Sequence, residues 1–89
     1  MEITGIRIYP FDTAASGGKI RAIADVDLDG CLTIKGIRIL ESKSGGLFLG
    51  MPSMKTRSGQ YRDMVIFTDK EFAENFRHQV IEAYKTNGI

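Results

Sequence analysis

The chain has 89 residues, which predicts one domain spanning residues 1–89, because chains divide into separate hydrophobic cores only at greater lengths. Its 43% hydrophobic and 26% charged residues exclude a disordered or collagen-like protein. The formal net charge of +1 excludes a protein covered in positive potential, so any nucleic-acid site must be local.

We expect neither a membrane span nor a secretory signal. No stretch approaches the roughly 20 apolar residues of a span, and the first residues lack the basic and apolar regions of a signal. The protein is therefore expected in the cytoplasm, without membrane contact. Cys31 is the single cysteine, so it predicts neither an intrachain disulfide nor a cysteine-ligated zinc. We interpret it as a small, partly buried hydrophobic residue.

Half-buried strands are predicted for the first part of the chain. Residues 6–9 alternate apolar and polar side chains, whereas Ile3 has the opposite parity across Gly5, which predicts a bulge at this glycine. Residues 11–18 contain a Ser-Gly-Gly run and predict a flexible connection. Residues 20–28 are the clearest strand, since every even position is apolar and the odd positions include three charged residues.

A hairpin and a second bulge are predicted next. Asp29-Gly30 is the usual chemistry of a two-residue hairpin turn, because both residues tolerate positive φ. The apolar parity then changes between residues 32–34 and 37–39, which predicts a bulge at Gly36. These strands are therefore expected to be antiparallel.

Shorter elements are predicted for the rest of the sheet. A turn is expected over residues 42–46, and a short strand over residues 47–51 that ends at Pro52. Residues 53–62 are predicted to be a polar loop. Residues 64–67, with the sequence Met-Val-Ile-Phe, are predicted to be a final strand.

The C-terminal segment changes to helical spacing. Five apolar residues follow one another at intervals of four, four, three and one, which places them on one helix face: Phe72, Phe76, Val80, Ala83 and Tyr84. Thr68 and Glu71 fit a capping box at the start of the helix. Asn87-Gly88 supplies a stop signal, so we expect one helix over about residues 69–86.

The predicted fold class is α+β: an antiparallel sheet of five or six short strands over about residues 2–67, followed by one C-terminal helix. Ordering a chain costs roughly 1.5 kcal/mol per residue, which so small a core offsets only narrowly. Short strands also leave unpaired edges that a symmetric partner can cover. We therefore expect a homodimer.

The acidic run Asp25-Val26-Asp27-Leu28-Asp29-Gly30 resembles the opening of a calcium-binding EF-hand loop. The match fails at position twelve, where a glutamate should close the coordination shell and this chain has Gly36. The flanks are also strand-like rather than helical. We interpret the carboxylates as a solvated acidic edge that discourages aggregation of the sheet, and we expect no metal site.

Catalytic chemistry is not expected either. The single histidine, His78, lies outside the apolar stripe of the predicted helix, so we interpret it as a surface residue rather than a general base. The sequence contains no GxGxxG, Walker A or HExxH motif, and its two Gly-Gly pairs lack the strand-to-helix context of a phosphate-binding loop. We therefore predict a protein that is not an enzyme and has no cofactor.

Positive charge is concentrated in the middle of the chain. Residues 1–34 contain three basic and five acidic groups, for a charge of −2, and residues 64–89 contain three and four, for −1. Residues 35–63 contain six basic and two acidic groups, for +4. Any nucleic-acid site is therefore expected in this middle segment.

Residues 51–63 carry cations, hydroxyl groups and an aromatic ring, the groups that contact a phosphate backbone and stack on bases. Lysine and arginine are the candidates for phosphate contacts, tyrosine for stacking or for bracing the loop, and serine and threonine for hydroxyl donors: Lys55, Arg57, Arg62, Tyr61, Ser53 and Thr56. Lys43 and Arg38 are second-rank candidates. The alternative is a solvated basic loop in which Tyr61 covers the edge of the core.

At these residues the chain resembles the SpoVG family of bacterial stage V sporulation proteins G, or septation regulators. The likeness covers about residues 1–66 and includes Met1-Glu2-Ile3-Thr4, Arg21-Ala22-Ile23-Ala24, Ile37-Arg38-Ile39 and Gly46-Leu47-Phe48. Its most specific part is the family pattern M-P-S-x-K followed by G-x-Y/F-x-D, matched here by Met51-Pro52-Ser53, Lys55, Gly59, Tyr61 and Asp63.

The resemblance implies a cytoplasmic, homodimeric α+β domain. It also implies site-selective binding of DNA and RNA, and modulation of gene expression, septation or sporulation in bacteria. The alternative is a protein-interaction adaptor of the division machinery, in which residues 51–63 contact an acidic protein partner rather than nucleic acid.

Overall fold

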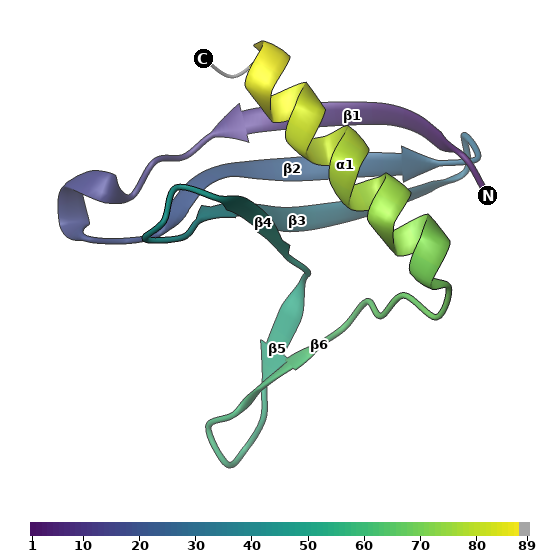
Figure 1. Ribbon diagram of the computed structural model, residues 1–89. Helices are drawn as coiled ribbons and strands as arrows, with labels where there is room; N and C mark the ends of the chain where they lie inside the picture. The colour runs from purple at the N-terminus through teal and green to yellow at the C-terminus, as the bar shows by residue number, and fades with distance from the viewer. Residues whose placement is uncertain (88–89) are drawn as a thin grey trace.

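Within residues 1–87, four antiparallel strands form a main sheet in the order β1-β2-β3-β4, and two more form a separate small sheet. The computed structural model describes residues 1–87, with strands β1 (Ile3–Pro10), β2 (Ile20–Leu28), β3 (Leu32–Glu41), β4 (Leu47–Gly50), β5 (Ser53–Lys55) and β6 (Tyr61–Asp63). One helix, α1 (Lys70–Asn87), crosses one face of the main sheet, and the β5–β6 hairpin extends away from it (Figure 1). The predicted α+β class, with antiparallel strands and a C-terminal helix, is confirmed.

Both predicted bulges are present. The register of β1 on β2 shifts at Gly5, and that of β3 on β2 shifts where Lys35 and Gly36 together face Asp25. Gly36 has a φ of 78°, which glycine adopts without steric cost. The buried Asp25 carboxylate accepts hydrogen bonds from the Gly36 N–H and from Lys35 Nζ, both at 3.2 Å. This carboxylate therefore satisfies the N–H group that the bulge removes from the ladder.

The prediction of a solvated acidic edge is wrong, because β2 lies inside the sheet between β1 and β3. Asp27 accepts hydrogen bonds from the Arg7 guanidinium at 2.9 Å and from the Thr33 hydroxyl at 2.6 Å. Asp29 accepts a hydrogen bond from the Glu2 N–H at 2.8 Å. These carboxylates join neighbouring strands and tie the N-terminus to the turn after β2.

The Asp27 contacts predict a stability that depends on pH. Hydrogen bonds from Arg7 and Thr33 lower the pKa of Asp27 to about 2, from an ordinary value of 3.8. A carboxylate with a depressed folded-state pKa stabilises the fold above its unfolded pKa, and this contribution disappears as the pH falls through the folded pKa. We therefore expect the melting temperature to fall between about pH 4 and pH 2, and Asp27→Asn to reduce that fall.

Circular dichroism melts across this range measure the effect. Asp63→Asn is the matched control, because Asp63 is also an exposed aspartate on a strand and forms no ion pair within residues 1–87. An acid-induced fall of equal size in wild type and Asp27→Asn would contradict the assignment.

The turn after β2 contains three residues rather than the predicted two. Asp29 and Gly30 have φ values of 54° and 63°, as the Asp-Gly sequence predicts. Leu28 pairs with Leu32, however, so Cys31 also belongs to the turn. Its side chain is exposed, which corrects its interpretation as a partly buried residue.

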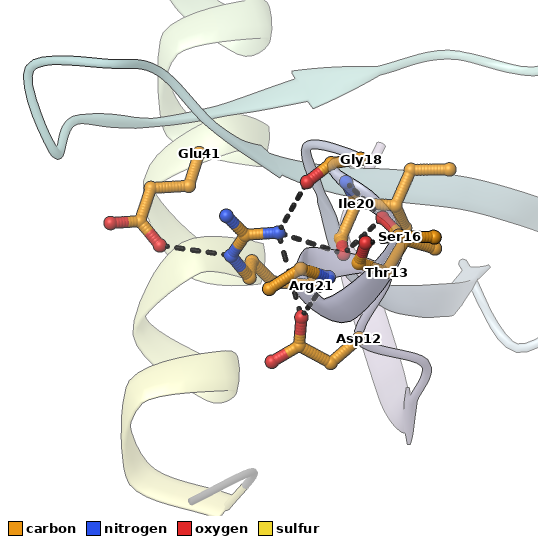
Figure 2. A network of polar contacts seen from close by, with 8 residues as sticks. Asp12, Thr13, Ser16, Gly18, Ile20, Arg21 and Glu41 are labelled. Atoms are coloured by element: carbon orange, nitrogen blue, oxygen red, sulfur yellow. Dashed lines mark hydrogen bonds and ion pairs between the residues drawn. The ribbon is translucent and has the colours of Figure 1, made fainter.

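Polar contacts hold the connection between β1 and β2, which also contains the short 3-10 helix η1 (Ala14–Ser16). Arg21 lies at the centre of these contacts (Figure 2). Its Nη1 donates to the Gly18 carbonyl at 3.0 Å and lies 3.5 Å from an Asp12 carboxylate oxygen. Its Nε donates to the Glu41 carboxylate at 3.0 Å. The connection predicted to be flexible is therefore tied to both β2 and β3.

The hydrophobic core lies between α1 and the facing side of the main sheet. Among the residues that the structure describes, eight apolar residues are at most 3% exposed: Ala22, Ala24, Val26, Leu28, Ile37, Ile39, Phe76 and Val80. Phe76 and Val80 are fully buried and Phe72 is half-buried, which confirms the predicted core face of the helix. The Phe76 ring also lies 5.0 Å from that of Phe67, measured between centroids. This contact joins the helix to the segment that precedes it.

The helix begins with a different cap from the predicted one. Asp69 Oδ1 accepts hydrogen bonds from the N–H groups of Glu71 at 3.0 Å and Phe72 at 3.4 Å, so Asp69 rather than Thr68 is the capping residue. The helix spans 70–87 where 69–86 was predicted, and the predicted stop at Gly88 lies outside the described residues. No helix in the described part of the chain is long and apolar enough to cross a membrane.

The predicted final strand over residues 64–67 is wrong. Within residues 1–87 this segment joins neither sheet, and the exposed fractions of Met64 and Ile66 are 60% and 74%. A β-forming sequence becomes a strand only where a partner edge is available. Here the chain leaves β6 and turns to start α1.

Candidate nucleic-acid interface

The segment predicted as a polar loop is a β-hairpin. Its strands β5 and β6 pair in a register that places Lys55 opposite Tyr61 and Met54 opposite Arg62. At its base the Met64 N–H donates to the Pro52 carbonyl at 2.7 Å. We call residues 52–64 the arm, because they extend away from the main sheet as a two-stranded ribbon (Figure 1).

A hydrogen-bonded turn closes the tip of the arm. The Gly59 N–H donates to the Thr56 carbonyl at 3.0 Å, and Gly59 has a φ of 88°, which favours glycine. The Thr56 N–H donates to the Gln60 carbonyl at 2.7 Å. The Thr56 hydroxyl accepts from the Gln60 N–H at 3.2 Å and lies 3.0 Å from the Ser58 hydroxyl. These bonds hold Arg57 at the end of the ribbon.

The register distributes the three cations over the whole ribbon. Directly opposed residues of an antiparallel pair share one face, so Lys55 lies with Tyr61 on one side and Arg62 lies with Met54 on the other. Arg57 lies in the turn between the strands. The arm therefore presents positive charge on both faces and at its tip.

The candidate cations and the tyrosine on the arm are open to solvent. Lys55, Arg57 and Arg62 are exposed, and none of them forms an ion pair within residues 1–87. Tyr61 is 71% exposed, so it does not cover the edge of the core as the alternative interpretation requires. Ser53 is half-buried at the base. The exposed cations and the tyrosine are thus available to a partner.

The two second-rank candidates lie elsewhere. Lys43 belongs to the turn before β4, whereas the arm follows the other end of that strand (Figure 1). Arg38 is half-buried on β3 opposite Gly50, and its Nη2 donates to the Met51 carbonyl at 2.9 Å. The structure therefore places Arg38 at the base of the arm and separates Lys43 from it.

Comparison with known proteins identifies the family. The sequence model of the SpoVG family matches residues 1–86. The chain belongs to the SpoVG family. Proteins named "Putative septation protein SpoVG" in Borreliella burgdorferi (strain ZS7) and Agathobacter rectalis are both 34% identical to it. These alignments cover 94% and 97% of this chain, and 86% and 94% of the length of the respective relatives.

The SpoVG sequence motif coincides with the arm. Met51 and Pro52 lead into β5, Lys55 ends that strand, Gly59 forms the turn, and Tyr61 begins β6. The motif residues therefore include those that shape the ribbon as well as a cation and an aromatic ring that it presents. This placement links the most specific part of the resemblance to the surface with the exposed cations.

Sequence reasoning missed the hairpin, although a signal for it was present. Residues 53–55 and 61–63 are short runs on either side of a five-residue segment that contains Gly59, the usual composition of a hairpin with a longer turn. Their polar side chains hid the pattern, because neither face of the ribbon is buried and apolar alternation is therefore absent. The hydrogen bond from Arg38 to the Met51 carbonyl had no sequence signal.

Proposed function

We propose that this SpoVG-family protein is a cytoplasmic regulator that binds nucleic acid through its arm. The proposal rests mainly on one observation, an exposed two-stranded ribbon with cations on both faces and at the tip: Lys55, Arg57 and Arg62. Lysine and arginine side chains that lack carboxylate partners attract phosphates without first breaking an ion pair. Tyr61 adds an exposed ring that can stack on a base.

The shape of the arm favours duplex DNA. The major groove of B-form DNA is about 12 Å wide and admits a two-stranded ribbon, whereas the major groove of an RNA duplex is deep and narrow. A ribbon in the groove has phosphates on both sides, and cations on both faces of the arm match this arrangement. Single-stranded RNA is a second ligand that the arm can bind, because the tyrosine can stack on its bases and the cations can contact its phosphates.

Gel-shift titrations with duplex DNA, duplex RNA and single-stranded RNA test the proposal. We expect binding to duplex DNA that weakens as the salt concentration rises, because phosphate contacts release counterions. Crosslinking in cells followed by sequencing of the bound nucleic acid then identifies its targets. Absence of binding to all three probes would reject the proposal and favour an adaptor whose arm contacts an acidic protein.

The names of the relatives indicate the cellular process, septation, in which we propose that nucleic-acid binding acts. Proteins 34% identical to the chain carry the name of septation proteins, and we infer that this protein modulates gene expression in septation or sporulation. Deletion of the gene, complemented with wild type or with a variant lacking the arm cations, tests whether binding and septation are linked. If the variant restores septation fully, nucleic-acid binding by the arm is not required for septation.

We further propose that the protein acts as a homodimer. The outer edges of β1 and β4 carry no strand partner within residues 1–87, and the apolar side chains of Leu32, Met64 and Ile66 are more than half exposed. A second chain that covers such surface adds stability to a small core. Light scattering at micromolar concentration should give twice the chain mass of 9.9 kDa. A mass of one chain, independent of concentration, would exclude the dimer.

A further inference from the structure

Arg38 spans the junction between the main sheet and the arm. Its side chain starts on β3 opposite Gly50, and its Nη2 donates to the Met51 carbonyl at 2.9 Å. A Cβ atom on Gly50 would lie 2.8 Å from the same nitrogen, so the guanidinium rests directly on the backbone of β4. Met51 is the residue that immediately precedes the arm. The contact is therefore made where the chain leaves the sheet.

No other hydrogen bond within residues 1–87 fixes the direction of the arm relative to the main sheet. Within residues 1–87, the hydrogen bonds made by residues 52–64 join arm residues to one another, at the base through Pro52 and Met64 and at the tip through Thr56. All side chains of β5 and β6 except that of Ser53 are exposed. An isolated two-stranded hairpin is marginally stable in water. A contact at its base therefore has a large influence on how the ribbon is held.

The guanidinium of Arg38 has a different kind of partner from those of the other arginines on the main sheet. Arg7 and Arg21 form ion pairs with carboxylates, whereas Arg38 has no carboxylate partner within residues 1–87. Its guanidinium bonds to a backbone carbonyl, which makes a charge-assisted hydrogen bond stronger than a neutral one. The half-buried position also limits its access to a ligand.

We propose that Arg38 is a positioning residue, which sets the direction of the arm through the Met51 carbonyl and does not itself contact phosphate. The consequence for binding rests on the proposed function, because it assumes that the arm holds nucleic acid. The consequence for the arm itself does not depend on that function. The two can therefore be measured separately.

The first test is nitrogen-15 relaxation of the free protein. Arg38→Met keeps the aliphatic stem and removes the donors, and Arg38→Lys keeps a charged donor. In Arg38→Met we expect order parameters of the arm to fall from about 0.85 to below about 0.6, while those of the main sheet stay unchanged. Arg38→Lys should restore them in part. Unchanged arm order parameters in Arg38→Met would overturn the proposal.

The second test is a salt titration of binding to duplex DNA. Loss of positioning should weaken binding by Arg38→Met several-fold at every salt concentration, with the slope of log affinity against log salt unchanged. Loss of a phosphate contact would instead reduce the steepness of that slope by about one for each chain. The positioning role would be overturned if the slope is reduced in Arg38→Met but stays at the wild-type value in Arg38→Lys. If wild type binds no nucleic acid, the proposed function fails while the relaxation experiment still decides the role of Arg38.

Discussion

Phe76→Ala should lower the free energy of unfolding by about 3 to 5 kcal/mol, the usual cost of removing a buried phenylalanine ring. The Phe76 side chain is fully buried, and its ring centroid lies 5.0 Å from that of Phe67 and 6.1 Å from that of Phe72. Removing it leaves a cavity between α1 and the sheet and takes away both ring contacts. Small domains have total stabilities of about 5 to 15 kcal/mol, so the variant should be partly unfolded at room temperature.

Urea unfolding followed by circular dichroism measures this loss. Phe11→Ala is the matched control, because it removes the same ring from a position that is 55% exposed and should change stability by less than about 0.5 kcal/mol. A Phe76→Ala midpoint no lower than that of Phe11→Ala would show that the helix does not depend on this packing.

Burial of an apolar face explains why most of the fold could be predicted from the sequence. The even positions of β2 and the four-residue spacing of Phe72, Phe76 and Val80 are visible because one side of each element packs on the other. The bulge at Gly36 was predictable for the same reason, since a bulge restores the apolar face after a change of parity.

The errors fall where burial gives no pattern. Residues 64–67 have strand-forming side chains but no partner edge, and the arm has partner edges but no buried face. Asp25 shows a third case, because a charged residue suggests an exposed strand although its carboxylate is buried and bonded to the bulge. Such pairings depend on tertiary contacts, which local sequence does not specify.

The sequence selects candidate site residues, but it does not predict their geometry. Local charge and the SpoVG motif selected Lys55, Arg57, Arg62 and Tyr61, and all four are exposed on the arm. The register that places two cations on opposite faces was not predictable, because it depends on how β5 pairs with β6. That distribution is what favours a ribbon surrounded by phosphates over a flat basic patch.

The variant Lys55→Ala, Arg57→Ala, Arg62→Ala should lose most of the salt dependence of nucleic-acid binding. In the proposed dimer, three cations on each chain would neutralise about six phosphates, which predicts a slope of log affinity against log salt of about −5 on duplex DNA. Between 50 and 200 mM salt, six such contacts reduce affinity about 10³-fold. Because the variant lacks these contacts, its affinity should be low at all salt concentrations and its slope much flatter.

A second variant separates local contacts from overall charge. Lys19→Ala, Lys70→Ala, Lys85→Ala removes the same three charges from exposed positions away from the arm, so its slope should stay close to that of wild type. Circular dichroism must first confirm that both variants are folded.

Binding to good and to poor DNA sites should weaken by the same factor in the arm variant, because phosphate contacts do not read the base sequence. Tyr61→Ala should lose roughly 1 to 3 kcal/mol for each base it stacks on. A folded arm variant with wild-type slope and affinity would place the nucleic-acid site elsewhere on the protein.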